Sequence, residues 1–189
     1  MQEVLVGIDL GTTFCKAGVV SLDGQELAQA RVLTPWDPVP TGAEMDPRRF
    51  VDIAREAALQ ALEQIGPCRV LGIGFTSMAE TGVLVDSKGQ PLAPAIAWHD
   101  QRGDDEAAEI AQVFGSEEFT LRTGLPASRL CSLAKLRWLL KRFPDLRQSW
   151  KWFNVSEWVA FSWGADPVAE FSLATRTGLL NLRQQCWWS

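Results

Sequence analysis

The chain has 189 residues, of which 47% are hydrophobic and 22% charged, and its formal net charge is −5. The length fits one domain, or one domain with a lobe attached, and the acidic balance argues against a nucleic-acid partner, because a general nucleic-acid binder carries a basic surface. No basic segment followed by a long apolar one opens the chain, and no apolar stretch approaches about 18 residues, so we expect no membrane span and a cytoplasmic protein.

Three apolar runs at the start predict a meander of antiparallel strands. Glu3–Asp9 and Cys15–Leu22 are the first two predicted strands. Asp23-Gly24 is a typical hairpin turn, and Gln25–Leu33 follows it as the third strand. The proline-rich stretch 34–42 predicts a loop.

A long amphipathic helix is predicted next. Asp46 has the residue type of an N-cap, and Pro47 suits the first helical position. Apolar residues then recur at helical spacing as far as Ile65, and Gly66-Pro67 ends the pattern.

The remaining elements alternate between strands and helices. Strands are predicted over Val70–Thr76, Thr81–Val85 and Ala95–Trp98, and helices over Asp104–Phe114, Ser132–Phe143 and Ser156–Trp163. Three antiparallel strands followed by a right-handed crossover onto a parallel strand describe a mixed sheet. The fold class is therefore α/β, resembling the ribonuclease H architecture, with helices on both faces of the sheet.

The first hairpin carries more polar groups than a turn requires. Asp9 ends a strand, where a carboxylate can hold Mg²⁺ directly or through its waters. Gly11 allows close backbone approach, and its amide, with those of Thr12 and Thr13, can form an anion-binding concavity. Lys16 adds a positive charge. These groups suit the phosphates of a nucleotide–metal complex, although a purely structural hairpin containing DxGT remains the alternative.

Four segments, in chain order, carry a resemblance to a known family. "GIDLGTTFCKAGVV" resembles the first phosphate motif of the actin, heat-shock ATPase and sugar kinase superfamily. "VLGIGFTSMAETGVLVDSKGQPLAPAIAWHDQRGDDE", "TGLPASRLCSLAKLRWLLKRFPD" and "EFSLATRTGLLNLRQQCWW" resemble segments of the FGGY carbohydrate kinases. The similarity covers essentially the whole chain.

The resemblance implies an ATP-dependent kinase that transfers the γ-phosphate of ATP to a hydroxyl of a sugar or polyol. It implies that Asp9 is associated with Mg²⁺ and that the phosphate loop comprises Gly11, Thr12 and Thr13, with Lys16 as the basic residue beside it. ATP and Mg²⁺ are thus the expected cofactors.

On the substrate side, the resemblance points to Ala79, Glu80, Asp100 and Arg102. Glu80 matches a glycerol-kinase carboxylate that accepts hydrogen bonds from hydroxyls, whereas Ala79 replaces that family's arginine. Leu130 stands where glycerol kinases have a tyrosine, so glycerol is a poor candidate substrate. Asp100 and Arg102 have two interpretations, a simple ion pair or a hydroxyl-binding pair in a cleft.

The family's catalytic Asp and its adenosine site are expected beyond Ser189. Residues 1–189 would then be most of the N-terminal, sugar-binding domain, truncated, with the C-terminal nucleotide-binding domain absent and no catalytic base in this chain, which would be inactive alone. The alternatives are a non-catalytic module that binds sugar or phosphate, and a fragment of an actin-like or chaperone-like ATPase. A homo-oligomer is possible.

Overall fold

The computed structural model describes residues 1–143 and 150–188. These residues form two compact units. Unit 1 contains Met1–Trp36, Asp46–Met78 and Val155–Pro167, and unit 2 contains the other described residues.

The centre of unit 1 is a four-stranded sheet in the order β3-β2-β1-β6. Its strands are β1 (Gln2–Leu10), β2 (Phe14–Ser21), β3 (Glu26–Leu33) and β6 (Cys68–Ser77). β1, β2 and β3 pair antiparallel, and β6 pairs parallel to β1. The predicted antiparallel meander followed by one parallel strand is therefore confirmed.

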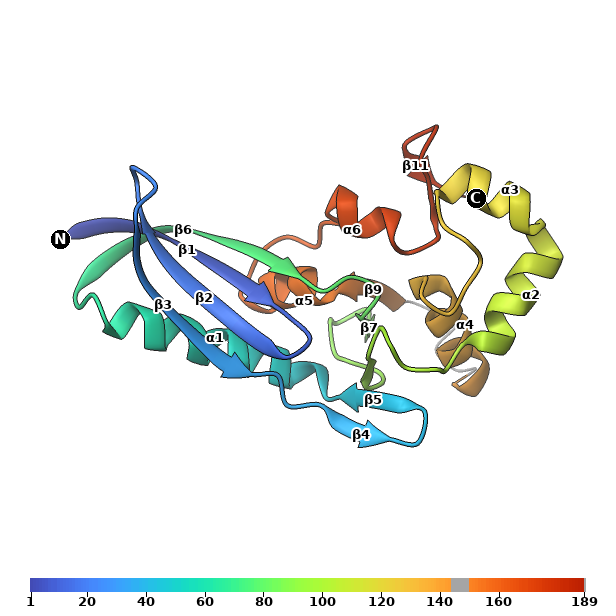
Figure 1. Cartoon of the computed structure of the whole chain (residues 1–189), viewed down its shortest axis with the longest axis horizontal. Coiled ribbons are helices and arrows are strands. Elements are labelled where there is room, and N and C mark those ends of the chain that lie inside the picture. Colours follow the sequence, from blue (N-terminus) through green and yellow to red (C-terminus); the bar gives the residue numbers. More distant parts are fainter. Residues whose placement is uncertain (144–149, 189) are drawn as a thin grey trace. The chain divides into compact units, whose positions relative to one another are not determined.

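Helix α1 (Pro47–Glu63) begins where the sequence predicts. Asp46 caps it, since the Asp46 side chain accepts a hydrogen bond from the Arg48 amide at 2.9 Å. Helix α1 runs along the sheet (Figure 1), and its buried apolar residues lie on the side that contacts β1, β2 and β3. Helix α5 (Val155–Ser162) is bound to α1 through Trp158, whose indole N–H donates to the Pro47 carbonyl at 2.9 Å.

Within unit 1, helices lie on one face of the sheet, and not on both faces as predicted for the fold. In β1 the buried side chains are Val4, Val6, Ile8 and Leu10, which all lie on the face that α1 and α5 contact. On the opposite face Leu5 is 43% exposed. An apolar run in a strand is typical of a sheet covered on both sides, but here the second face is mostly glycine and exposed side chains.

Unit 2 combines small sheets with helices. Its sheets pair β4-β5-β8, β7-β9 and β10-β11. The strands are β4 (Asp37–Val39), β5 (Gly42–Met45), β7 (Gly82–Asp86), β8 (Ala95–Ile96), β9 (Trp150–Asn154), β10 (Leu180–Asn181) and β11 (Cys186–Trp187). The helices are α2 (Asp104–Phe114), α3 (Ser116–Thr123), α4 (Ser132–Arg142) and α6 (Phe171–Thr175). One buried cluster joins α2, α3 and α4 through Ala107, Ile110, Phe119, Leu125, Cys131 and Ala134.

The predicted helices over α2, α4 and α5 are confirmed to within one or two residues. The predicted loop 34–42 is partly wrong, because β4 lies inside it and β5 begins at its end. The last residue of the predicted helix Ser132–Phe143 is the C-cap of α4. No helix among the described residues is long and apolar enough to cross a membrane.

Candidate functional site

The turn between β1 and β2 is held from one side by the segment that follows β3. The Thr34 hydroxyl donates to the Gly11 carbonyl at 2.8 Å, the Trp36 indole N–H donates to the Thr12 carbonyl at 2.8 Å, and the Thr34 amide donates to the Thr13 carbonyl at 2.9 Å. In a planar trans peptide the N–H points opposite to the C=O. The amides that follow these carbonyls therefore point away from the 34–36 segment.

Gly11 is required by its surroundings. Its amide donates to the Phe14 carbonyl at 3.1 Å, so this N–H is used within the turn. A Cβ at Gly11 would lie 2.8 Å from the same carbonyl oxygen, which is closer than real Cβ contacts allow. Of the three predicted phosphate-loop amides, those of Thr12 and Thr13 are the ones directed away from the supporting segment.

Asp9 and Lys16 are opposite each other on β1 and β2. The Lys16 ammonium lies 3.6 Å from an Asp9 carboxylate oxygen, and both side chains are substantially exposed. They line a hollow of about 450 Å³ on the open face of the sheet. The hollow exists because Gly74, Gly7 and Gly18 are neighbours across three strands and carry no side chains. Even a Cβ added at any of the three would meet no other part of the chain within 4 Å.

The described residues contain no group of three or more histidine, cysteine, aspartate or glutamate side chains that would hold a metal ion. A metal at the hairpin could use the exposed Asp9 carboxylate at the end of β1 as a ligand. Mg²⁺ suits this arrangement, because it commonly keeps several waters and binds one or two carboxylates together with substrate phosphates.

In unit 2, Glu80 has an unusual backbone conformation. Its φ is 62°, in the left-handed region, which costs about 1–3 kcal/mol for a residue other than glycine. Its carboxylate accepts a hydrogen bond from the Arg176 Nε at 2.6 Å, and the Arg176 Nη2 makes a further close ion pair with it. The Glu80 side chain is 13% exposed and that of Arg176 43%. Ala79, next to Glu80, adds no polar side-chain group.

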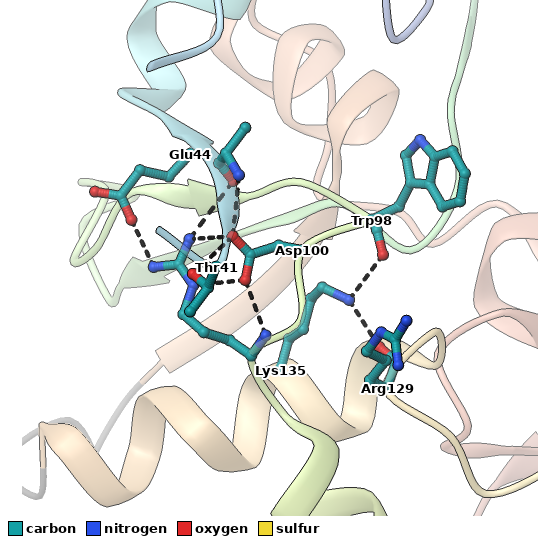
Figure 2. Close-up of polar contacts among 8 residues, drawn as sticks. Thr41, Glu44, Trp98, Asp100, Arg129 and Lys135 are labelled. Atoms are coloured by element: carbon teal, nitrogen blue, oxygen red, sulfur yellow. Dashed lines mark hydrogen bonds and ion pairs between the residues drawn. The ribbon is translucent and has the colours of Figure 1, made fainter. Parts of the chain in front are cut away.

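Asp100 lies in a network with Thr41 and Glu44 of the β4–β5 region (Figure 2), and Arg102 belongs to the same network. The Asp100 carboxylate accepts hydrogen bonds from the Thr41 hydroxyl at 3.2 Å and the Ala43 amide at 3.0 Å. It also accepts from the Arg102 Nε and Nη2, both at 2.8 Å. The Arg102 Nη1 donates to Glu44 at 2.6 Å. Asp100 is 0% exposed, so its oxygens are turned to its own chain.

Arg102 is the cation between the two carboxylates of this network, Asp100 and Glu44. Burial by itself raises the pKa of Asp100, but the hydrogen bonds from Arg102, its positive charge and the Thr41 hydroxyl outweigh burial and hold the pKa below its ordinary value. Asp100 is therefore a carboxylate at neutral pH. The network favours the ion-pair interpretation, in which the two residues fix the loop that carries them.

Lys135 in α4 is a buried cation that the sequence interpretation did not select. It is 0% exposed, and its ammonium donates to the Trp98 carbonyl at 3.1 Å and the Arg129 carbonyl at 2.7 Å (Figure 2). Burial lowers its pKa to about 8, although the charges of Asp100 and Glu80 act to raise it. The two candidate substrate regions are thus both within electrostatic reach of one ammonium.

Sequence reasoning also missed Arg176. In the sequence, Arg176 is simply the basic residue of the segment "SLATRTGLL", and nothing near it indicates a partner or a ligand. His99 lies edge-on to Trp98, with ring centroids 5.4 Å apart. Leu130 is 42% exposed. The structure thus pairs Glu80 with Arg176, and it places the Lys135 ammonium where the charges of both Asp100 and Glu80 act on it.

The mixed α/β fold of the chain matches that of solved sugar kinases. The sequence model of the FGGY family of carbohydrate kinases, N-terminal domain, matches residues 4–189. The chain belongs to this family.

Individual relatives are similar along nearly the whole chain. A gluconokinase of Bacillus subtilis is 26% identical over 189 residues, covering 99% of this chain and 37% of the relative. A glycerol kinase of Citrifermentans bemidjiense is 34% identical over 198 residues, covering 98% of this chain and 40% of the relative. The solved xylulose kinase of Rhodospirillum rubrum has a TM-score of 0.91 at 29% identity, covering 98% of this chain and 39% of that chain. The chain thus spans about two-fifths of the length of the curated relatives it matches.

Proposed function

We propose that this chain is the N-terminal, sugar-binding part of an ATP-dependent kinase that phosphorylates a hydroxyl of a sugar or polyol. The observation that carries the proposal is the β1–β2 turn. Thr34 and Trp36 donate hydrogen bonds to three successive carbonyls of this turn, and the exposed Asp9 carboxylate lies next to it. Family membership and the kinase names of the relatives support it.

The hairpin would serve the phosphates of ATP. The outward-directed amides and the Thr13 hydroxyl are donors suited to phosphate oxygens, and Lys16 adds a positive charge. The Thr12 hydroxyl lies 3.8 Å from the Met78 sulfur, to which it donates. Asp9 would hold Mg²⁺, which when bound neutralises charge on the phosphates. A loop fixed by Thr34 and Trp36 needs little reorganisation when it receives an anion.

The charged cluster of unit 2, which consists of Glu80, Asp100, Arg102, Lys135 and Arg176, would form the sugar-binding site. Glu80 is held by Arg176 in a strained conformation, and strain of this kind is common at ligand-binding residues. A carboxylate accepts hydrogen bonds from hydroxyl groups, which is what a sugar or polyol offers. Asp100 and Arg102, chosen from the sequence as substrate residues, would act mainly by holding the 97–103 loop.

The remaining parts of the proposal concern the whole protein. The meander β3-β2-β1 with parallel β6 supports a ribonuclease H-like sheet. The remainder of the first domain, beyond Ser189, would supply the catalytic base, and a C-terminal nucleotide-binding domain would supply the adenosine site. Both are consistent with the two-fifths share of the relatives. A cytoplasmic location is part of the same proposal, on the sequence grounds given above.

The test is ADP production by the full gene product with ATP and Mg²⁺, screened against sugars, polyols and sugar acids. Sugar-dependent ADP production supports the kinase. ADP production without any sugar would favour an ATPase, and ligand binding without ADP would favour a binding module.

Replacing Glu80 by Gln tests the sugar side. We expect the KM for the sugar to rise by about ten- to a hundredfold, since a hydrogen bond to a charged group is worth roughly 1.5–3 kcal/mol, while the KM for ATP stays the same. The matched control is Glu118→Gln, which removes a half-exposed carboxylate from an ion pair with Arg122 on α3. Equal changes in both KM values would remove Glu80 from the sugar site.

A further inference from the structure

The first turn of α4 connects the segments that carry the candidate sugar-binding residues. The Lys135 ammonium binds the carbonyls of Trp98 and Arg129. The amides of Ser132 and Leu133 donate to the carbonyls of Arg176 and Thr177, at 3.4 and 2.8 Å. The first turn of α4 therefore binds both the loop that contains Trp98 and the segment that contains Arg176, the residue that pairs with Glu80.

The loop that carries Asp100 and Arg102 also packs closely on this turn. Gly103 has φ +100°, and a Cβ there would lie 3.2–3.3 Å from atoms of Ala134, the neighbour of Lys135. The 97–103 loop is thus in contact with the first turn of α4 at two places, through the Trp98 carbonyl and through Gly103.

A buried ammonium is a costly way to fill this space. Removing a charged group from water is unfavourable unless its donors are satisfied, and a methionine of similar length would avoid that cost. A methionine, however, has no N–H to donate. Only a group with several donors can bind the carbonyls of two separate segments at once. The cost of burial is therefore consistent with a task in holding the loop.

We propose that Lys135 is a positioning residue of the sugar site, whose ammonium fastens the 97–103 loop to the turn before α4 and so fixes the geometry presented to the sugar. The proposal rests on the proposed kinase function for its link to sugar, but the fastening itself is a property of this chain alone. Trp98, 37% exposed, lies at the fastened end of the loop.

The test compares Lys135→Met with Lys141→Met in the full gene product. Lys141 is on the same helix but is half-exposed and pairs with Glu106 and Glu109, so its replacement controls for loss of a lysine from α4. For Lys135→Met we expect the sugar KM to rise by about tenfold or more and the ATP KM to change by less than about twofold. Amide hydrogen exchange in residues 97–103 should accelerate by about tenfold or more, with no change in Lys141→Met.

Lys135→Arg is the rescue variant, and we expect it to restore part of the sugar KM because it keeps the charge and several donors. If Lys135→Met does not fold, the test rests on Lys135→Arg, for which a rise of a few-fold in the sugar KM, with the ATP KM unchanged, is expected.

The outcomes separate this proposal from the kinase assignment. Unchanged exchange in residues 97–103, or equal rises in the sugar and ATP KM values, would overturn the positioning role. If the wild-type protein shows no sugar-dependent ADP production, the kinase assignment fails, and faster exchange in Lys135→Met would then support the fastening while its link to sugar is lost.

Discussion

The β1–β2 hairpin of unit 1 and the charged cluster of unit 2 achieve order in different ways. At the hairpin, backbone carbonyls are fixed by Thr34 and Trp36, and the charged side chains Asp9 and Lys16 stay accessible to water. In unit 2 the charged side chains themselves are buried, with Asp100 and Lys135 both 0% exposed.

The difference has a physical consequence. A loop ordered by its backbone keeps its charged side chains available for a ligand, so removing one of them affects binding more than folding. A cluster ordered by buried charges depends on each partner, so removing one leaves an uncompensated charge in the interior. The hairpin is therefore expected to be sensitive in activity and the cluster in stability.

Asp9→Ala gives the largest expected effect. ADP production by the full gene product should fall by at least about a hundred- to a thousandfold, because the carboxylate that would hold Mg²⁺ near the phosphates is lost. The midpoint of thermal unfolding should hardly change, since the side chain is 43% exposed. The control is Glu3→Ala, which removes another exposed carboxylate from β1, and an active Asp9→Ala protein would contradict the phosphate assignment.

Asp100→Asn tests the other side of the comparison. The free energy of unfolding should fall by about 3 kcal/mol, because a buried ion pair loses one partner. Urea titration measures the loss, and Asp104→Asn, from an exposed pair with Arg129, should cost less than about 1 kcal/mol.

The loss in Asp100→Asn should also depend on pH. The pKa of Asp100 is lowered by folding, so its contribution is complete above its ordinary value of 3.8 and disappears as the pH falls through the folded-state value. The difference between wild type and Asp100→Asn should therefore narrow below about pH 4. A difference that stays constant down to pH 2 would mean that the ionised carboxylate is not what stabilises the loop.

Gly11→Ala asks how tightly the hairpin backbone is fixed. The added Cβ would meet the Phe14 carbonyl oxygen at 2.8 Å, so we expect a loss of roughly 1–3 kcal/mol in the free energy of unfolding. Gly18→Ala is the matched control on β2, because nothing lies within 4 Å of a Cβ there. Equal stability of the two variants would show that the turn adapts easily.

The hairpin could be predicted from the sequence because its parts are close together in the chain. Asp9, the glycine, the threonines and Lys16 all lie within one strand–turn–strand segment, and turn chemistry is a local property. The supporting bonds from Thr34 and Trp36 were not predicted, since they join residues 23 and 24 positions apart. No local pattern marks an indole that donates to a loop carbonyl.

The cluster of unit 2 depends on distant segments, and so less of it could be predicted. Asp100 bonds to residues 57 and 59 positions earlier, and Lys135 to a carbonyl 37 positions earlier. In the sequence, Lys135 belongs to an amphipathic helix whose lysines look alike. Strands β4 and β5 were missed for the same reason, because the short β5 is stabilised by pairing with β8 some fifty residues later in the chain.

The smallest expected effect concerns the charge of Lys135. Its pKa is about 8 in the folded chain against an ordinary value of 10.5, so between these values the folded state releases a proton that the unfolded state keeps. Stability contributed by Lys135 should therefore rise with pH in this window. The neutral amine still has two N–H groups, one for each carbonyl, so the fastening survives the loss of charge while the cost of burying it disappears.

The measurement is the free energy of unfolding of wild type and Lys135→Met at pH 7 and pH 9. The free energy of unfolding of wild type, relative to that of Lys135→Met, should increase by about 1 kcal/mol from pH 7 to pH 9. The charged or polar groups of Asp100, Cys131, Glu80 and Arg129 also face the ammonium, so the comparison is repeated in a Cys131→Ala background, which removes the thiol. If wild type instead loses stability relative to Lys135→Met as the pH rises, the charged ammonium, and not the neutral amine, is needed to bind the two carbonyls.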